Sequence, residues 1–164
     1  MKKLYLIGGT MGVGKTTVSQ TLKMQLENSV FLDGDWCWDA HPFQVTEETK
    51  EMVLENICTI LNNFLKCTAY ENIIFCWVMH EQSIIDTILS RLNTENCRVI
   101  TISLLCSKEK LIQRLQKDVA GGIRFSDVIE RSIKRIALYQ NLNTIKIDTS
   151  DKDAAEIAKE IAAI

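Results

Sequence analysis

Blocks of apolar and polar residues alternate along the chain and predict strands and helices in turn. Five short aliphatic or β-branched runs, each bounded by polar or glycine-containing turns, are typical of buried parallel strands; they cover Lys3–Gly8, Val30–Asp33, Asn72–Met79, Arg98–Leu104 and Thr144–Ile147. Between these runs, apolar residues recur at helical spacing. This spacing predicts helices over Lys15–Glu27, Thr46–Lys66, Glu81–Leu92, Ser107–Lys117, Asp127–Tyr139 and Asp151–Ala162.

The alternation predicts an α/β fold in three layers. Repeated strand–helix units need right-handed crossovers, which place a parallel sheet between helices on both of its faces. The length of 164 residues fits one domain over residues 1–164. We expect no domain boundary, because the chain has no linker, no internal repeat and one proline, Pro42.

The stretch that follows the first predicted strand reads Gly-Thr-Met-Gly-Val-Gly-Lys-Thr, from Gly9 to Thr16. It matches the pattern G-x-x-x-x-G-K-[ST], in which backbone N–H groups and the first turn of the next helix form an anion site. Lys15 would reach the β- and γ-phosphates, and the Thr16 hydroxyl would bind Mg²⁺. A glycine-rich turn that binds nothing is the alternative, which the strand–loop–helix context disfavours. The sequence therefore predicts a nucleoside triphosphate site formed by Gly9, Thr10, Met11, Gly12, Val13, Gly14, Lys15, Thr16 and Thr17.

Two carboxylates, Asp33 and Asp35, follow the second predicted strand. Ligand sites of open α/β sheets lie at the carboxyl ends of the strands, so this pair is expected beside the phosphate-binding loop. Phosphoryl transfer needs one carboxylate to help orient hydrated Mg²⁺ and another to orient or deprotonate the acceptor. We assign the metal role to Asp33, together with Thr16, and the acceptor role to Asp35. A turn stabilised by Asx hydrogen bonds is the alternative interpretation.

The segment from Trp36 to Phe43 keeps two interpretations open. Trp36, Trp38 and His41 could line an acceptor pocket with stacking surfaces and hydrogen bonds. Equally, the tryptophans could seal a helix against the sheet, and His41 could be a capping or surface group.

The third predicted strand has no acid in its apolar part, from Ile73 to Met79. Glu81 could serve from just beyond the strand, but it fits equally well in the first turn of a helix. The missing acid disfavours a motor ATPase and shifts the metal role toward Asp33. The chain also lacks the Asn-Lys-x-Asp signature of guanine binding, which disfavours a GTPase.

Basic residues downstream are candidates for phosphate contacts. The pair Gly121–Gly122 between two helices predicts a hinge, beside which Arg124 could close over the phosphates as a bidentate guanidinium. Arg131 and Arg135 share one helix face, where pairing with neighbouring acids is the alternative. Asp148 follows the last strand at the same sheet edge and is expected to border the adenine.

The composition narrows the class of partner. A net charge of −2 gives no positive field, which disfavours a nucleic-acid partner. No apolar run is long enough to span a bilayer, and the N-terminus enters a strand rather than a signal peptide, so we expect a cytoplasmic protein without a membrane partner. The six cysteines include no C-x-x-C pair and are expected to be free thiols.

These residues together resemble the small P-loop kinases, a group that includes gluconate, shikimate, adenylylsulfate and nucleoside monophosphate kinases. The resemblance implies a five-stranded P-loop NTPase sheet in the order 2-3-1-4-5, a mobile lid at about residues 117–126, and ATP with Mg²⁺ as the phosphoryl donor. It also implies that Arg114 stacks on the adenine and that Arg124 is a lid arginine. Asp35 with His41 has a weaker likeness to the zeta-toxin type of kinase, although the arginine that normally stands between the two is missing. No clear pair of acceptor-phosphate arginines follows the second strand, so the acceptor is left open.

The sequence thus predicts an ATP- and Mg²⁺-dependent phosphotransferase that moves the γ-phosphoryl group to a metabolite hydroxyl or phosphate. Lys15, Asp35 and Arg124 are the predicted catalytic residues, and a small-molecule acceptor is the predicted partner of a monomer or homodimer. A nucleotide or nucleic-acid 5′-kinase is one alternative, and it would need a basic track. A non-catalytic ATP-binding switch is the other, and the acidic pair disfavours it.

Overall fold

The computed structural model describes residues 1–124 and 126–164. Within these residues, the strands form one parallel sheet in the order β2-β3-β1-β4-β5. The predicted strands and the predicted strand order are confirmed. The strands are β1 (Lys2–Gly8), β2 (Ser29–Asp33), β3 (Asn72–Trp77), β4 (Cys97–Leu105) and β5 (Ile145–Asp148).

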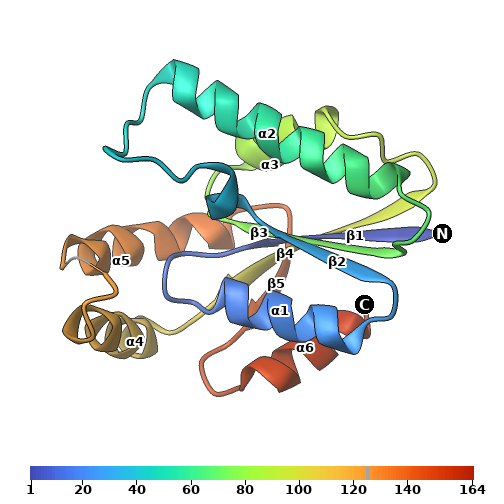
Figure 1. The fold of residues 1–164 in the computed structure, drawn as a ribbon. Helices are drawn as coiled ribbons and strands as arrows, with labels where there is room; N and C mark the ends of the chain where they lie inside the picture. The colour runs from blue at the N-terminus through green and yellow to red at the C-terminus, as the bar shows by residue number, and fades with distance from the viewer. Residues whose placement is uncertain (125) are drawn as a thin grey trace.

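Helices cover both faces of the sheet, as Figure 1 shows, so the predicted three-layer architecture is confirmed. One pair of helices, α1 and α6, packs below the sheet in this view, and α2 and α3 pack above it. A third pair, α4 and α5, projects at the end of the sheet where the strands finish. A short 3₁₀ helix, η1, directly follows β2. The bounds are α1 (Lys15–Gln25), η1 (Gly34–Cys37), α2 (Glu47–Lys66), α3 (Gln82–Ser90), α4 (Lys108–Ala120), α5 (Asp127–Gln140) and α6 (Ala154–Ala162).

Alternate side chains of β1 enter two separate cores, one on each face of the sheet. Tyr5 and Ile7 pack in the core that includes α1, α4 and α6. Leu4 and Leu6 pack in the core that includes α2 and α3. All four side chains are at most 1% exposed. A central parallel strand is covered on both faces, which explains why its sequence is a continuous apolar run.

Most element ends differ from the predicted ones by one to three residues, and three of these differences have a clear local cause. α6 begins at Ala154 instead of residue 151, because Asp153 forms a capping box around its N-terminus with Glu156. α4 continues past residue 117 to residue 120 and ends where Gly122 adopts a φ of 72°. β3 ends at Trp77 because its register partner, residue 8, is the last residue of β1.

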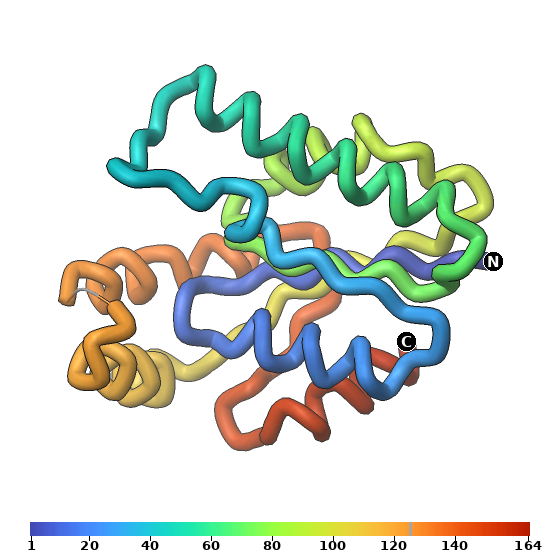
Figure 2. Tube along the Cα trace, viewed as in Figure 1, coloured from blue at the N-terminus to red at the C-terminus, as the bar shows by residue number. Residues whose placement is uncertain are grey.

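Three connections meet at one end of the molecule, which is the left side of Figure 2. The loop of residues 9–14 joins β1 to α1 there, residues 38–46 lead from η1 to α2, and the chain passes from α4 to α5. Because the strands are parallel, all their carboxyl ends point toward these connections. This end of the sheet is therefore where a ligand site is expected.

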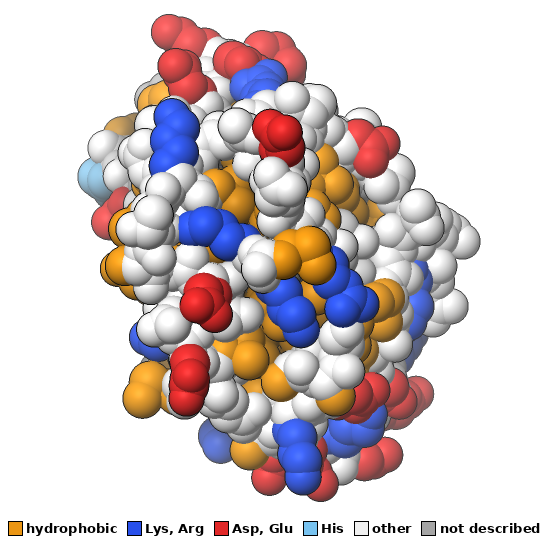
Figure 3. Space-filling view, turned by 90° about the vertical axis from the view of Figure 1, so that its right-hand side faces the viewer, with side chains coloured by type: hydrophobic (Ala, Val, Ile, Leu, Met, Phe, Trp, Pro, Cys, Tyr) orange, Lys and Arg blue, Asp and Glu red, His pale blue; other side chains and the backbone are white. Residues whose placement is uncertain are grey.

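The face from which the N-terminus emerges carries charges of both signs. Figure 3 shows Lys and Arg side chains mixed with Asp and Glu over this face, with hydrophobic side chains between them. Among the described residues of this face, the basic side chains do not form one continuous surface. In the described part of the chain, no helix combines the length and the apolar character needed to cross a membrane.

α2, which follows the segment of residues 38–46, begins with a reciprocal cap. The Thr46 hydroxyl accepts from the backbone N–H of Thr49 at 3.1 Å, and the Thr46 N–H donates to the Thr49 hydroxyl at 2.8 Å. We expect Thr46→Ala to lower the free energy of unfolding by about 1 kcal/mol in urea titrations, since it leaves a helix donor unpaired. Thr59→Ala makes the same change at an exposed site of the same helix and should be neutral or slightly stabilising. Equal losses in the two variants would contradict the role of the cap.

Candidate functional site

The loop between β1 and α1 has a backbone that its glycines make possible. Gly12 and Gly14 have φ values of 82° and 101°, which side chains other than glycine rarely adopt. At Gly12, a Cβ atom would also lie 2.6 Å from Cδ2 of Leu115, so the loop packs closely on α4. Gly14 is the N-cap of α1, and the free N–H groups of that helix therefore begin at the loop.

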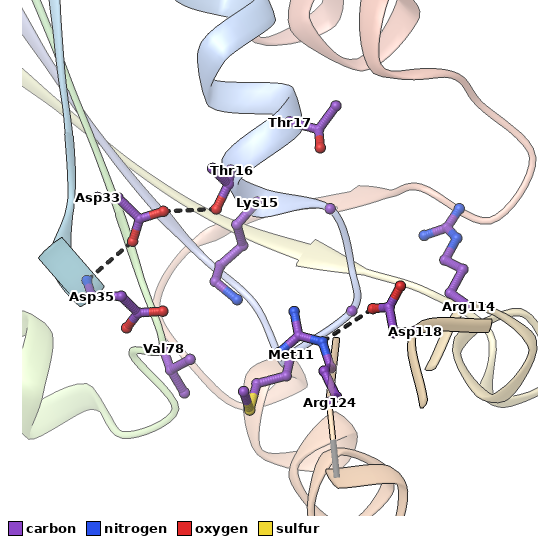
Figure 4. Close-up of a pocket in the computed structure, with 12 residues that line it drawn as sticks. Met11, Lys15, Thr16, Thr17, Asp33, Asp35, Val78, Arg114, Asp118 and Arg124 are labelled. Carbon is purple, nitrogen blue, oxygen red and sulfur yellow. Dashed lines mark hydrogen bonds and ion pairs between the residues drawn. The ribbon is translucent and has the colours of Figure 1, made fainter. Parts of the chain in front are cut away.

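The loop forms one wall of a cavity of about 310 Å³. Figure 4 shows side chains from α1, from the end of β2 and from the α4 region pointing into it. Residues predicted from four separate stretches of sequence thus meet at one place. The cavity is lined by Met11, Gly12, Gly14, Lys15, Thr16, Thr17, Asp33, Asp35, Val78, Arg114, Asp118 and Arg124.

Lys15 lies at the centre of this cavity, with its Nζ donating to the backbone oxygen of Thr10 at 3.1 Å. Burial lowers the pKa of Lys15 to about 8, and the nearby Arg124 acts in the same direction. The carboxylates of Asp35 and Asp33 offset this only in part. Within the described residues, no carboxylate lies within 4.0 Å of the ammonium group. The site therefore holds a partly buried cation that an anionic ligand could pair.

Asp33 uses its two carboxylate oxygens for two different tasks. Oδ2 accepts from the Thr16 hydroxyl at 2.7 Å, and Oδ1 accepts from the backbone N–H of Asp35 at 3.1 Å, which caps η1. The hydrogen bond of the turn interpretation is thus present, and Asp33 also lines the cavity, where its metal role stays a prediction. Asp33 is 6% exposed.

The donor set of Thr16 and Asp33 fits Mg²⁺. Magnesium in phosphate-transfer sites takes one or two protein oxygens and completes its shell with water and phosphate oxygens. Across residues 1–124 and 126–164, no group of three or more His, Cys, Asp or Glu side chains could hold a metal ion alone. The Thr16 hydroxyl and the Asp33 carboxylate, which lie beside the loop, match a site with one or two protein oxygens.

Asp35 lies on the β2 side of the cavity, with Lys15 between it and Arg124 (Figure 4). Desolvation by the cavity walls, followed by repulsion from Asp33, raises the pKa of Asp35. Lys15, a hydrogen bond from the Trp77 side chain and Arg124 oppose this shift. The carboxylate therefore combines access to the cavity with an increased affinity for a proton.

Beside Asp33, the residue of β3 is Cys76 and not an acid. It is aligned with Ile7 of β1 on one side and with Asp33 of β2 on the other. Burial raises the pKa of the Cys76 thiol to about 12, so the position is neutral. In this part of the sheet, the carboxylate that contacts Thr16 therefore comes from β2, as Asp33, and not from β3.

The two cavity arginines are held by partners that the sequence analysis did not identify. Arg114 donates to the backbone oxygen of Val13 at 3.3 Å and to the backbone oxygen of Thr149 at 2.9 Å. Arg124 donates from Nε to Oδ2 of Asp118 at 3.0 Å. Asp118 is separated from Arg124 by the turn that ends α4, and Thr149 lies 35 residues after Arg114, beyond α5 and β5, so periodicity alone could not have paired them.

Four predicted nucleotide-binding residues do not line the cavity. Gly9, Thr10 and Val13 belong to the loop but lie behind its inner surface, where Thr10 and Val13 are buried. Asp148 accepts from the backbone N–H and the hydroxyl of Ser150 at 2.9 and 2.6 Å. Its predicted contact with adenine stays a prediction.

The segment after η1 forms a second cavity of about 420 Å³ with α2. Trp38 lines it and stacks against Phe43 with ring centroids 4.5 Å apart, whereas Trp36 is 59% exposed and contacts Phe31 edge-on. His41 is exposed. Trp38 therefore packs against the core and also faces a cavity, and its contact with an acceptor stays a prediction. The second cavity is lined by Cys37, Trp38, Asp39, Ala40, Pro42, Gln44, Thr49, Met52 and Asn56.

The predicted lid at about residues 117–126 has several parts. Residues 117–120 are the last residues of α4, and residues 121–124 form the turn that follows. Residue 125 lies outside the described residues.

Comparison with protein families gives a match over most of the chain. A family model described as an AAA domain matches residues 6–132. The chain belongs to the AAA domain family. Small kinases and motor ATPases share a phosphate-binding loop of this kind. A comparison with the curated proteins finds no match to this chain.

Solved structures relate this AAA domain protein to small kinases by fold. It is similar to a gluconokinase from Sinorhizobium meliloti 1021, with a TM-score of 0.72 and 16% identity over 98% of this chain and 90% of that one. The tunicamycin resistance protein of Deinococcus radiodurans has a TM-score of 0.72 and 19% identity over 99% and 95%. A sugar kinase from Janibacter sp. HTCC2649 has a TM-score of 0.77 and 14% identity over 99% and 94%. The predicted small P-loop kinase fold is confirmed.

The lowered pKa of Lys15 predicts how the stability of this AAA domain protein depends on pH. In the unfolded chain Lys15 should titrate near its ordinary value of about 10.4, and in the folded chain it titrates near pH 8. Between these values the unfolded state holds the additional proton, so stability rises with pH. We expect the wild type to gain up to roughly 3 kcal/mol relative to Lys15→Met from pH 7 to pH 10.5.

Urea unfolding of both proteins at several pH values measures this difference. Subtracting the Lys15→Met curve removes most of the contribution of other groups that titrate in the same range, such as Cys76. At pH 7 the variant should be the more stable protein, since it lacks the buried charge. A difference that stays constant with pH would contradict the prediction.

Proposed function

We propose that this protein is a small-molecule kinase that transfers the γ-phosphoryl group of ATP to a hydroxyl or phosphate of a metabolite, with Mg²⁺. The observation that supports this most directly is the cavity itself. It brings the loop lysine Lys15, the oxygen pair of Thr16 and Asp33, and the carboxylate of Asp35 to one place. A simple binding switch does not require the last of these groups.

Catalysis in this proposal consists of positioning and charge neutralisation. Bound ATP supplies the phosphoryl group, and Mg²⁺ neutralises charge on its phosphate oxygens. Lys15 and Arg124 would hold the phosphates, and Thr16 with Asp33 would hold the metal. Asp35 would accept a hydrogen bond from the acceptor hydroxyl and take its proton as the new bond forms. Its raised pKa favours this role.

In this proposal the acceptor binds at the second cavity, which offers apolar surface, uncharged polar groups and one carboxylate, Asp39. The second cavity, between the segment after η1 and α2, has no Lys or Arg among its described lining residues. The proteins similar in structure include a gluconokinase, a sugar kinase and a shikimate kinase. A panel of acceptors should therefore include sugars, sugar acids, nucleosides, nucleotides and aminoglycoside-like compounds.

A screen of this panel for acceptor-dependent ADP release tests the proposal. We expect one class of compound to stimulate ADP release from ATP and Mg²⁺, and Asp35→Asn to lower that rate about 10²-fold or more, because the general base is lost. Asp86→Asn, the same change at an exposed acid of α3 that lines neither cavity, is the matched control and should keep most of the activity. Wild-type turnover in Asp35→Asn would contradict the assigned role. ATP binding without any acceptor-dependent turnover would favour the non-catalytic switch.

The metal role of Asp33 has a test that does not depend on the acceptor. Asp33→Asn keeps an oxygen that can accept from Thr16 but removes the negative charge. We expect the Mg²⁺ concentration that gives half of the ATP-induced rise in melting temperature to increase about 10-fold or more. Asp86→Asn again serves as the control. An unchanged Mg²⁺ requirement would show that Asp33 has only its structural role in capping η1.

A further inference from the structure

Arg124 enters the cavity as one member of an ion pair. Its Nε lies 3.0 Å from Oδ2 of Asp118, and the two side chains are 29% and 30% exposed. Both residues line the cavity, and Figure 4 draws the contact between them. It is less exposed than the ion pair between Arg131 and Asp127 in α5, whose side chains are 57% and 65% exposed.

The backbone between the two residues is a fixed turn. The N–H of Ile123 donates to the oxygen of Asp118 at 2.9 Å, and the N–H of Gly122 donates to the oxygen of Val119 at 3.0 Å. With Gly122 at a φ of 72°, these bonds form a Schellman cap at the end of α4. The glycine pair that was predicted to be a hinge therefore ends a helix here, and it places Arg124 close to the last turn of α4.

Asp118 uses only one edge of the guanidinium. Arginine carries five N–H donors, of which Nε supplies one and the two terminal nitrogens supply four. In Figure 4 the terminal nitrogens of Arg124 point away from Asp118, toward the side of the cavity where Lys15 lies. Within the described residues, these nitrogens donate no hydrogen bond to protein. The edge of the guanidinium suited to bidentate phosphate binding is thus left available.

We propose that Asp118 is a positioning residue that holds Arg124 by Nε so that its terminal nitrogens face the γ-phosphate of a bound triphosphate. The inference rests on the proposed function, because it assumes that ATP occupies the cavity. It has a consequence for specificity: the pair should favour a triphosphate over a diphosphate.

The negative charge of Asp118 also affects how removal of Arg124 changes ligand binding. A negative charge beside bound phosphates is unfavourable unless a cation neutralises it, and Arg124 is the cation that contacts Asp118 here. Removal of Arg124 alone would leave this carboxylate to repel the ligand. The effect of removing Asp118 should therefore change sign according to whether Arg124 is present.

A double-mutant cycle tests this coupling. The measured quantity is the ratio of the Kd for ADP to the Kd for AMPPNP, a non-hydrolysable triphosphate, each titrated calorimetrically with Mg²⁺. The proteins are the wild type, Asp118→Asn, Arg124→Ala, the double variant and Asp127→Ala as the matched control. Asn is nearly isosteric with Asp, so the turn should fold, and melting curves of each variant verify this.

We expect Asp118→Asn to lower the preference for the triphosphate about three- to tenfold, and Arg124→Ala to lower it about tenfold or more. The double variant should bind the triphosphate more tightly than Arg124→Ala does. Asp127→Ala should match the wild type.

Three results would overturn the proposal. If Asp118→Asn keeps the wild-type preference, Asp118 has no positioning role. If it strengthens triphosphate binding, Asp118 competes with the phosphate for Arg124. If Asp118→Asn weakens binding equally with and without Arg124, its effect is structural. Absence of nucleotide binding by the wild type would instead refute the proposed function, and this inference with it.

Discussion

The arrangement of the site depends on the hydrogen bond from the Thr16 hydroxyl to Asp33, which is 2.7 Å long. It joins the first turn of α1, which follows β1, to the end of β2, although β3 lies between these two strands. The residue of β3 aligned with both strands is Cys76, a small and neutral side chain. A carboxylate at this position would compete for Thr16 and repel Asp33. The neutral side chain of Cys76 in β3 therefore allows β2 to supply the acid next to the phosphate-binding loop, Asp33.

Most of the fold could be predicted because each step relied on local pattern. Apolar runs marked the strands, helical spacing marked the helices, and the crossover rule made the sheet parallel. Element ends were less predictable, because they depend on competing caps. At α6, for example, Ser150 and Asp153 are both plausible N-caps by residue type, and the reciprocal bond with Glu156 selects Asp153.

Site residues could be predicted where they belong to one contiguous sequence motif. Lys15, Thr16 and the pair of Asp33 and Asp35 follow strand ends directly, so topology alone brings them to the cavity. Asp118 and Thr149 were missed, since their partners are set by how turns fold and not by spacing along a helix. The same applies to Trp38, whose place between a core and a cavity depends on the path of the chain toward α2.

The burial of Lys15 without a carboxylate in contact has a consequence for how long the protein would persist in a cell. An empty site carries the cost of an unpaired cation, whereas a bound polyphosphate would remove this cost and add its own binding energy. A ligand at 100 times its Kd stabilises a folded protein by about 2.7 kcal/mol. Proteases act mainly on transiently unfolded molecules, so turnover of the empty form would be faster. The abundance of such a protein would then follow the supply of its nucleotide.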